Sequence, residues 1–144
     1  MAKSVRDVMT DVVRYAEPSQ SLVEAARAMR EEDVGSLPVA EGGRLVGVLT
    51  DRDIVTRAVA EGIDPATITV AEVASRELIT VSPEQDLHEA LRLMARHQVR
   101  RLPVVSGQRL VGILAQADIA TLAETESTAK TIAEISEPST GDRS

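Results

Sequence analysis

Thr50 and Asp53 are the two residues whose types and spacing most directly suggest binding chemistry. They stand in the phrase GVLTDRDIV at positions 47–55, where a predicted strand passes into a predicted helix. The first turn of a helix has unpaired N–H groups and the positive end of the helix dipole, so it favours an anion. A threonine hydroxyl there can donate to a phosphate oxygen, and a carboxylate one turn later can accept from the 2′ and 3′ hydroxyls of a ribose.

The same two residues also fit a capping box, T-x-x-D, in which Thr50 caps the helix and Asp53 answers it without any ligand. Both interpretations remain open. The phrase recurs as GILAQADIA at 112–120, with Asp118 in place of Asp53 but Ala115 in place of Thr50. Since the second copy lacks the hydroxyl that would cap the helix or bind phosphate, we expect two unequal sites. The tighter one should be built around Thr50 and Asp53.

Three arginines are candidates for binding the phosphate. Arg100 and Arg101 stand in VRRLPVV, where the first copy has Gly35 and Ser36, so the basic character belongs to the second copy alone. An arginine fork suits phosphate, and the alternative for one of the two is a surface ion pair in a protein of net charge −7. Arg52, inside the first phrase, can meet phosphate or remain solvated on its helix.

Metal binding and catalysis find little support in the sequence. The two histidines, His88 and His97, lie nine residues apart on one predicted helix, which puts them on opposite faces, and the chain has no cysteine. No nucleophile–base pair, gathered carboxylates or G-x-x-x-x-G-K loop is present. We therefore expect no metal site, no required cofactor and no enzymatic activity.

An internal repeat defines the elements that must position these residues. The stretch 5–58 aligns without a gap with 70–123, including Leu-Pro-Val at 37–39 and 102–104. In the first copy we predict a strand at 12–15, a helix that starts at Ser21 with the capping box SLVE, strands at 36–40 and 44–49 joined by the turn EGG, and a helix at 51–60. The second copy repeats this order, and its first helix starts at Asp86 with DLHE.

The predicted organisation is a first repeat at 1–62, a linker at 63–69, a second repeat at 70–125, and a short helix with a disordered polar tail at 126–144. Two copies are too few for a solenoid, so we expect a closed pair related by a pseudo-two-fold axis. Apolar residues recur at helical spacing on the second helix of each copy, and they fit packing between repeats or against a second subunit. They are Ile54, Val55, Ala58, Val59, Ile119, Ala120 and Ala123.

Composition argues against two classes of partner. Tyr15 is the only aromatic residue, so no stacking platform for single-stranded nucleic acid is available, and the net charge of −7 repels a phosphate backbone. The chain has no run of about 18 apolar residues and no signal peptide at its start. We expect a cytoplasmic protein that binds neither nucleic acid nor a membrane.

The duplicated units and the phrase G-h-h-T-x-x-D resemble a tandem pair of cystathionine β-synthase (CBS) domains, the Bateman module. The short format with LTDRDIV and HQVRRLPV is similar to the small hypoxic-response type. The resemblance implies an α/β fold of two β-α-β-β-α repeats, clefts between the repeats that hold adenosine nucleotides, and a homodimer formed through the helices. It also implies that adenine lies beside residues just before the first helices, here Tyr15, Thr80 and Val81.

Two functions remain open. The first is a non-catalytic regulatory module that binds AMP, ADP or ATP and acts on an unknown effector protein as an energy or stress sensor. The second is a stress-response scaffold whose clefts stay empty. The T-x-x-D pattern at 50–53 favours the first function, because a pure scaffold does not need it.

Overall fold

The computed structural model describes residues 3–122 of the 144-residue chain. Its centre is one four-stranded sheet, in which β1 (Ser36–Glu41) and β2 (Arg44–Thr50) form one hairpin and β3 (Arg101–Ser106) and β4 (Arg109–Ala115) form the other. The strand order is β1-β2-β4-β3, and the hairpins meet where Arg44 of β2 pairs with Arg109 of β4. Each repeat therefore supplies one half of the sheet.

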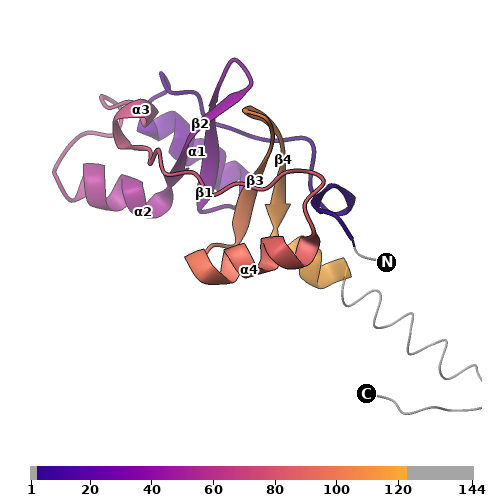
Figure 1. Cartoon of the computed structure of the whole chain (residues 1–144). Helices are drawn as coiled ribbons and strands as arrows, with labels where there is room; N and C mark the ends of the chain where they lie inside the picture. The colour runs from indigo at the N-terminus through magenta and orange to yellow at the C-terminus, as the bar shows by residue number, and fades with distance from the viewer. Residues whose placement is uncertain (1–2, 123–144) are drawn as a thin grey trace, which may run out of the picture.

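Helices precede and follow each hairpin, as the repeat predicts. α1 (Leu22–Glu32) and α4 (Leu87–His97) come before the hairpins, and α2 (Asp51–Ile54) follows β2. After β4, residues 116–122 are helical. Figure 1 shows the helices of the first repeat at one end of the sheet, and α4 with the last described helix at the other. The α/β fold of two repeats is confirmed.

The start of each copy packs into the core of the other copy. Two short helices do this: η1 (Val5–Asp7) and α3 (Val70–Val73). Val70 and Val73 are buried in the first repeat's core beside Leu22, while Val5 is buried in the second repeat's core beside Leu87. The repeats thus exchange their first helices, and neither core is complete within one continuous copy of the repeat.

The strand predicted at 12–15 does not form. In its place Ala16 makes a one-residue parallel bridge with Val39, in which the Ala16 N–H donates to the Pro38 carbonyl at 2.9 Å. The pairing stops there because the Glu17 N–H turns to the Gln20 side chain and Pro18 has no N–H to donate. Val81 makes the matching single bridge with Val104 in the second repeat.

α1 and α4 start where the sequence predicts, but the SLVE capping box of α1 is only half made. Ser21 Oγ accepts from the Glu24 N–H at 3.2 Å, and the predicted return bond from the Glu24 carboxylate is not formed. Asp86 caps α4 by accepting from the His88 N–H at 2.7 Å.

The helix predicted at 51–60 changes character along its length. After α2 it continues as a π-helix over Val55–Val59, where the Ala60 N–H donates to the Val55 carbonyl. The helix predicted after residue 125 lies outside the described residues. Among the helices of the described part, none has both the length and the apolar character needed to cross a membrane.

Candidate functional site

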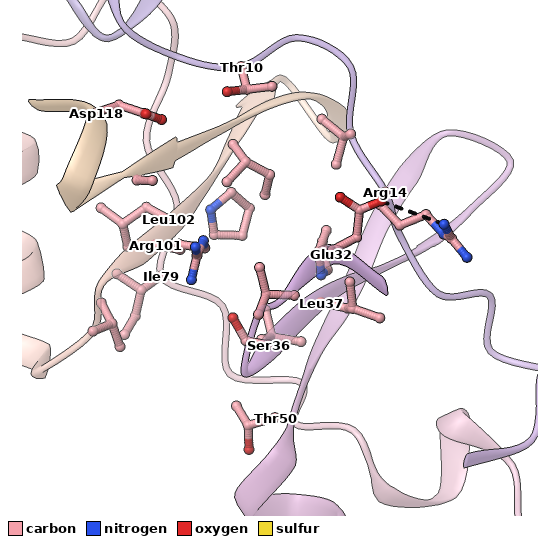
Figure 2. Close-up of a pocket in the computed structure, with 18 of the residues that line it drawn as sticks. Thr10, Arg14, Glu32, Ser36, Leu37, Thr50, Ile79, Arg101, Leu102 and Asp118 are labelled. Carbon is pink, nitrogen blue, oxygen red and sulfur yellow. Dashed lines mark ion pairs between the residues drawn. The ribbon is translucent and has the colours of Figure 1, made fainter. Parts of the chain in front are cut away.

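A cavity of about 580 Å³ lies between the two repeats and has the size of a small-molecule site. Figure 2 shows side chains of both repeats around it, with Ser36, Leu37 and Thr50 from the first hairpin, Arg101 and Leu102 from the second, and Asp118 from the helix after β4. Most of the lining comes in matched pairs from the two copies. Such pairs include Ser36 with Arg101, Leu37 with Leu102, Val34 with Val99, Glu32 with His97, and Thr50 with Ala115. The two predicted clefts therefore open into one shared space.

Three of the residues predicted from the sequence line this cavity: Thr50, Arg101 and Asp118. The other six are not among its lining residues. They are Tyr15, Arg52, Asp53, Thr80, Val81 and Arg100. Only part of the predicted set therefore lines the cavity, and the reason why a residue is or is not in the lining differs from residue to residue.

The two adjacent arginines, Arg100 and Arg101, differ in their exposure and in their position relative to the cavity. Arg101 opens β3, is partly buried and lines the cavity, whereas Arg100 precedes the strand and is exposed. The Arg100 carbonyl accepts from the Gln116 N–H at 2.8 Å, which fixes the backbone at this corner. Because neighbouring side chains in extended backbone point to opposite sides, only one of the two can face the cavity.

The residues predicted beside adenine, Tyr15, Thr80 and Val81, are not among the lining residues of this cavity. Val81 is 2% exposed and belongs to the second core, and Tyr15 is 43% exposed. Arg14 and Ile79, which belong to the same two segments just before the first helices, line the cavity. The repeat matches these two residues with each other, and their side chains differ by a full charge.

Thr50 and Asp53 form the capping box that the sequence left open as an alternative. The Asp53 N–H donates to Thr50 Oγ1 at 3.1 Å, and the Thr50 N–H donates to Asp53 Oδ2 at 3.2 Å. The other carboxylate oxygen of Asp53 lies 4.0 Å from Arg57 Nε, and the Asp53 side chain is only 17% exposed. Asp53 and the Thr50 hydroxyl are therefore both engaged in the cap of their own helix.

Asp118 is in a different situation from Asp53. Ala115 has no hydroxyl to exchange with it, so the second copy forms no capping box. Asp118 is exposed and lines the cavity, and within residues 3–122 its carboxylate makes no hydrogen bond or ion pair. Losing the hydroxyl at position 115 thus leaves this carboxylate free to meet a ligand.

The positive charge in the cavity also belongs to the second repeat. In the first hairpin, strand pairing sets Ser36 opposite Thr50, so two hydroxyl side chains face each other. In the second hairpin, the matching pair is Arg101 opposite Ala115, which is a guanidinium opposite a methyl group. Arg14, the other guanidinium at the cavity, is paired with Glu31 and Glu32 at 3.1 and 3.6 Å. Figure 2 shows the Arg14–Glu32 contact as a dashed line at the rim.

Arg101 has no such partner. Among the described residues no carboxylate lies within ion-pair distance of its guanidinium, which is partly buried in the cavity. A partly desolvated guanidinium without a counter-charge favours a bound anion, and its planar fork matches a phosphate. The cavity therefore joins apolar walls to guanidinium, hydroxyl and carboxylate groups, which can bind phosphate and sugar. Its polar and charged lining residues are Thr10, Arg14, Glu32, Ser36, Thr50, Ser75, Glu77, His97, Arg101 and Asp118.

Comparison with known proteins gives the family. The sequence matches the CBS domain over residues 5–60 and again over 70–124. It is similar to the CBS domain-containing protein YhcV of Bacillus subtilis (strain 168), at 49% identity over 117 residues that cover 81% of this chain and 83% of the relative.

Two solved structures share the fold. One is a crystal structure of Hypoxic Response Protein I with two coordinated zinc ions, at 44% identity, a TM-score of 0.76, and coverage of 83% of this chain and 98% of that chain. The other is the CBS domain pair of protein MJ0100 in complex with 5′-methylthioadenosine and S-adenosyl-L-methionine, at 26% identity, a TM-score of 0.75, and coverage of 88% and 99%.

No cluster of candidate metal ligands is found in the described part of this chain. Within residues 3–122, no three side chains among His, Asp and Glu gather closely enough to hold a metal ion, and the sequence contains no cysteine. The family match and the paired hairpins agree on the rest of the architecture. The chain belongs to the CBS domain family, as a tandem pair of the kind found in Hypoxic Response Protein I.

Proposed function

We propose that this chain is a non-catalytic regulatory module that binds an adenine nucleotide (AMP, ADP or ATP) in the cavity between its repeats. The observation that carries the proposal is the Arg101 guanidinium, which has no ion-pair partner within residues 3–122, in a cavity with apolar walls from both hairpins. The apolar side chains would hold the base, Arg101 and the Thr50 hydroxyl would bind phosphate, and Asp118 would accept from the ribose hydroxyls. The adenosine compounds bound to the MJ0100 pair support this class of ligand.

The two halves of the cavity offer unequal sites. The sequence ranks the half around Thr50 and Asp53 first, because it alone keeps the hydroxyl. The geometry supports the other half, since Asp53 is already engaged by Thr50 and Arg57 whereas Asp118 and Arg101 are free among the described residues. We propose that Arg101 and Asp118 make the principal contacts and that Thr50 assists from across the cavity.

A ligand in this position would act as a signal because it touches both repeats. The hairpins meet at a single residue pair, Arg44 with Arg109, so a ligand bridging them would change how firmly they are held together. A homodimer formed through the helices, in the cytoplasm, could pass that change to an effector protein. The similarity to Hypoxic Response Protein I supports a role in stress sensing.

Thermal unfolding with and without nucleotide tests the proposal directly. A ligand that binds only the folded state stabilises it by RT ln(1 + [L]/Kd), about 2.7 kcal/mol at a hundredfold excess over Kd. We expect AMP, ADP or ATP to raise the unfolding temperature, adenosine to raise it less, and inorganic phosphate to have little effect. No response to any adenine nucleotide at millimolar concentration would contradict the proposal.

A ligand-free scaffold is the second candidate, and one observation favours it. The capping box of Thr50 and Asp53 accounts for the T-x-x-D pattern without any ligand. This function predicts that substitutions of Arg101 or Asp118 leave stability unchanged in the presence and absence of nucleotide. The same thermal measurement therefore separates the two candidates.

A further inference from the structure

Glu77 is a charged residue of the cavity to which the proposed function gives no role. The segment 75–81 runs from one hairpin to the other, since Ser75 pairs with β2 and Val81 pairs with β3. Between these two anchors, Ser75, Glu77 and Ile79 line the cavity. Residues two apart share one side of an extended segment, so the course of the backbone directs the Glu77 side chain to the space that a ligand would occupy.

The matching segment of the first copy has no charge at this place. Thr10 pairs with β4 and Ala16 pairs with β1, and the repeat matches Glu77 with Val12, which also lines the cavity. Arg76, the neighbour of Glu77, is outside the cavity lining and borders a separate hollow. The second copy therefore adds a carboxylate to the cavity without adding a cation beside it.

The charges that line the cavity do not favour a ligand with many negative charges. Arg14 is compensated by its two glutamate partners at 3.1 and 3.6 Å. With histidine counted as neutral, the other charged lining residues are Arg101, Asp118 and Glu77, and within residues 3–122 none of them makes an ion pair. One guanidinium thus stands against two carboxylates in a protein of net charge −7. The guanidinium can match one phosphate group, whereas each further phosphate meets repulsion.

We propose that the cavity prefers a nucleoside monophosphate to the di- and triphosphate, and that the charge of Glu77 determines this preference. The inference rests on the proposed function and narrows its ligand to AMP. A cavity of about 580 Å³ takes drug-sized ligands, so its size alone does not select among the three nucleotides. Because Glu77 is exposed, salt screens its repulsion of the phosphates, and the preference is strongest at low ionic strength.

Calorimetry of the full chain with AMP, ADP and ATP tests the preference. The titrations are made without divalent cations, at about pH 8, where a terminal phosphate is fully ionised. We expect the affinity to fall in the order AMP, ADP, ATP, with AMP at least about tenfold tighter than ATP in about 0.01 M salt. In about 1 M salt the difference should shrink severalfold, because the Debye length falls to about 3 Å.

Two variants test whether Glu77 is the determinant. Glu77→Gln removes the charge at nearly constant size and should lower the ratio of AMP to ATP affinity about three- to tenfold in low salt. Glu61→Gln is the matched control, since it changes the net charge equally at an exposed residue outside the cavity lining, and it should leave the ratio unchanged. Unfolding temperatures without ligand show that both variants are folded.

The other outcomes overturn the inference in distinguishable ways. ATP binding as tightly as AMP to the parent rejects the preference and leaves the proposed function standing. A preference that Glu77→Gln does not change, or that both variants lower equally, rejects Glu77 as its determinant. A loss of AMP affinity in Glu77→Gln as large as the loss of ATP affinity means that Glu77 contacts the nucleoside and does not act on the phosphates. No binding of any of the three nucleotides rejects the proposed function, and this inference with it.

Discussion

Arg101 is the residue whose removal should affect ligand binding most, since it is the guanidinium of the cavity without a carboxylate partner among the described residues. A hydrogen bond to a charged group contributes roughly 1.5–3 kcal/mol, which corresponds to about tenfold or more in affinity. We expect Arg101→Ala to weaken AMP binding at least tenfold in calorimetry. Arg100→Ala is the matched control, because its side chain is exposed and outside the cavity lining. A larger loss in the control would contradict the assignment.

We expect the two aspartates of the repeated phrase to have different roles, with Asp53 contributing to stability and Asp118 to ligand binding. Asp53→Ala removes half of a capping box and should lower stability by about 0.5–2 kcal/mol, with a smaller effect on AMP affinity. Asp118→Ala removes an exposed carboxylate at the cavity and should lower AMP affinity while leaving unfolding almost unchanged. Chemical denaturation and calorimetry on both variants check this. The opposite pattern would return the principal site to Thr50 and Asp53, as the sequence alone ranks it.

The types of side chain at the site could be predicted from the sequence better than which of those side chains line the cavity. Thr50, Arg101 and Asp118 were recognisable because hydroxyl, guanidinium and carboxylate groups stand at the ends of predicted strands. The sequence did not show that Asp53 is engaged within its helix while Asp118 is not. This difference depends on whether the residue three positions earlier has a hydroxyl that exchanges hydrogen bonds with the aspartate. The contact of Tyr15 and Thr80 with a base stays a prediction: neither lines the cavity, and alternation along their irregular segments could not be assigned from the sequence.

At the scale of elements, one substitution can give the helix at 116–122 the same capping residues that begin α2. Ala115→Thr restores T-x-x-D in the second copy and should let Asp118 cap its own helix. We expect stability to rise by about 0.5–2 kcal/mol and AMP affinity to fall, because the carboxylate becomes engaged. If the affinity rises instead, the hydroxyl is a phosphate ligand and the sequence-based ranking is right. Denaturation and calorimetry on this one variant give both quantities.

The cap of α3 predicts a dependence of stability on pH. The Thr69 N–H donates to Glu72 Oε2 at 2.8 Å, and this backbone hydrogen bond lowers the pKa of Glu72 in the folded protein. A lowered folded pKa means that the stabilisation is present above the unfolded value of about 4.3 and is lost as the pH falls through the folded value. Glu72→Ala should therefore be less stable than the parent at pH 7, and the difference should shrink as the pH falls through the lowered folded pKa of Glu72. A constant difference would show that packing, not ionisation, is responsible.

Element boundaries were predictable where the signal is local. α1 and α4 begin beside Ser21 and Asp86 because a side-chain oxygen there accepts a backbone N–H. The strand predicted at 12–15 does not form, and the single bridge of this segment joins Ala16 to Val39, a distant partner that the local sequence does not reveal. The π-helical turn after Ile54 has no signal in the apolar spacing.

At the scale of the whole molecule, the exchange of η1 and α3 couples the two repeats more strongly than the sheet does. Val5 is fully buried in the second core, and Val70 is fully buried in the first. Opening either repeat therefore exposes apolar surface that belongs to the other copy. We expect a single cooperative unfolding transition, although the sheet joins the two hairpins at one residue pair.

Single valine truncations test this coupling. Val5→Ala and Val70→Ala each remove two buried methyl groups and should cost about 1–3 kcal/mol. Because the cores are interlocked, both variants should shift the same transition, as seen by calorimetry and by urea denaturation. Val12→Ala is the matched control, since that side chain is 85% exposed and should change stability by less than about 0.5 kcal/mol. Two separated transitions in Val5→Ala, with only the second repeat destabilised, would mean that the cores unfold independently and that the exchanged helices contribute little to the coupling.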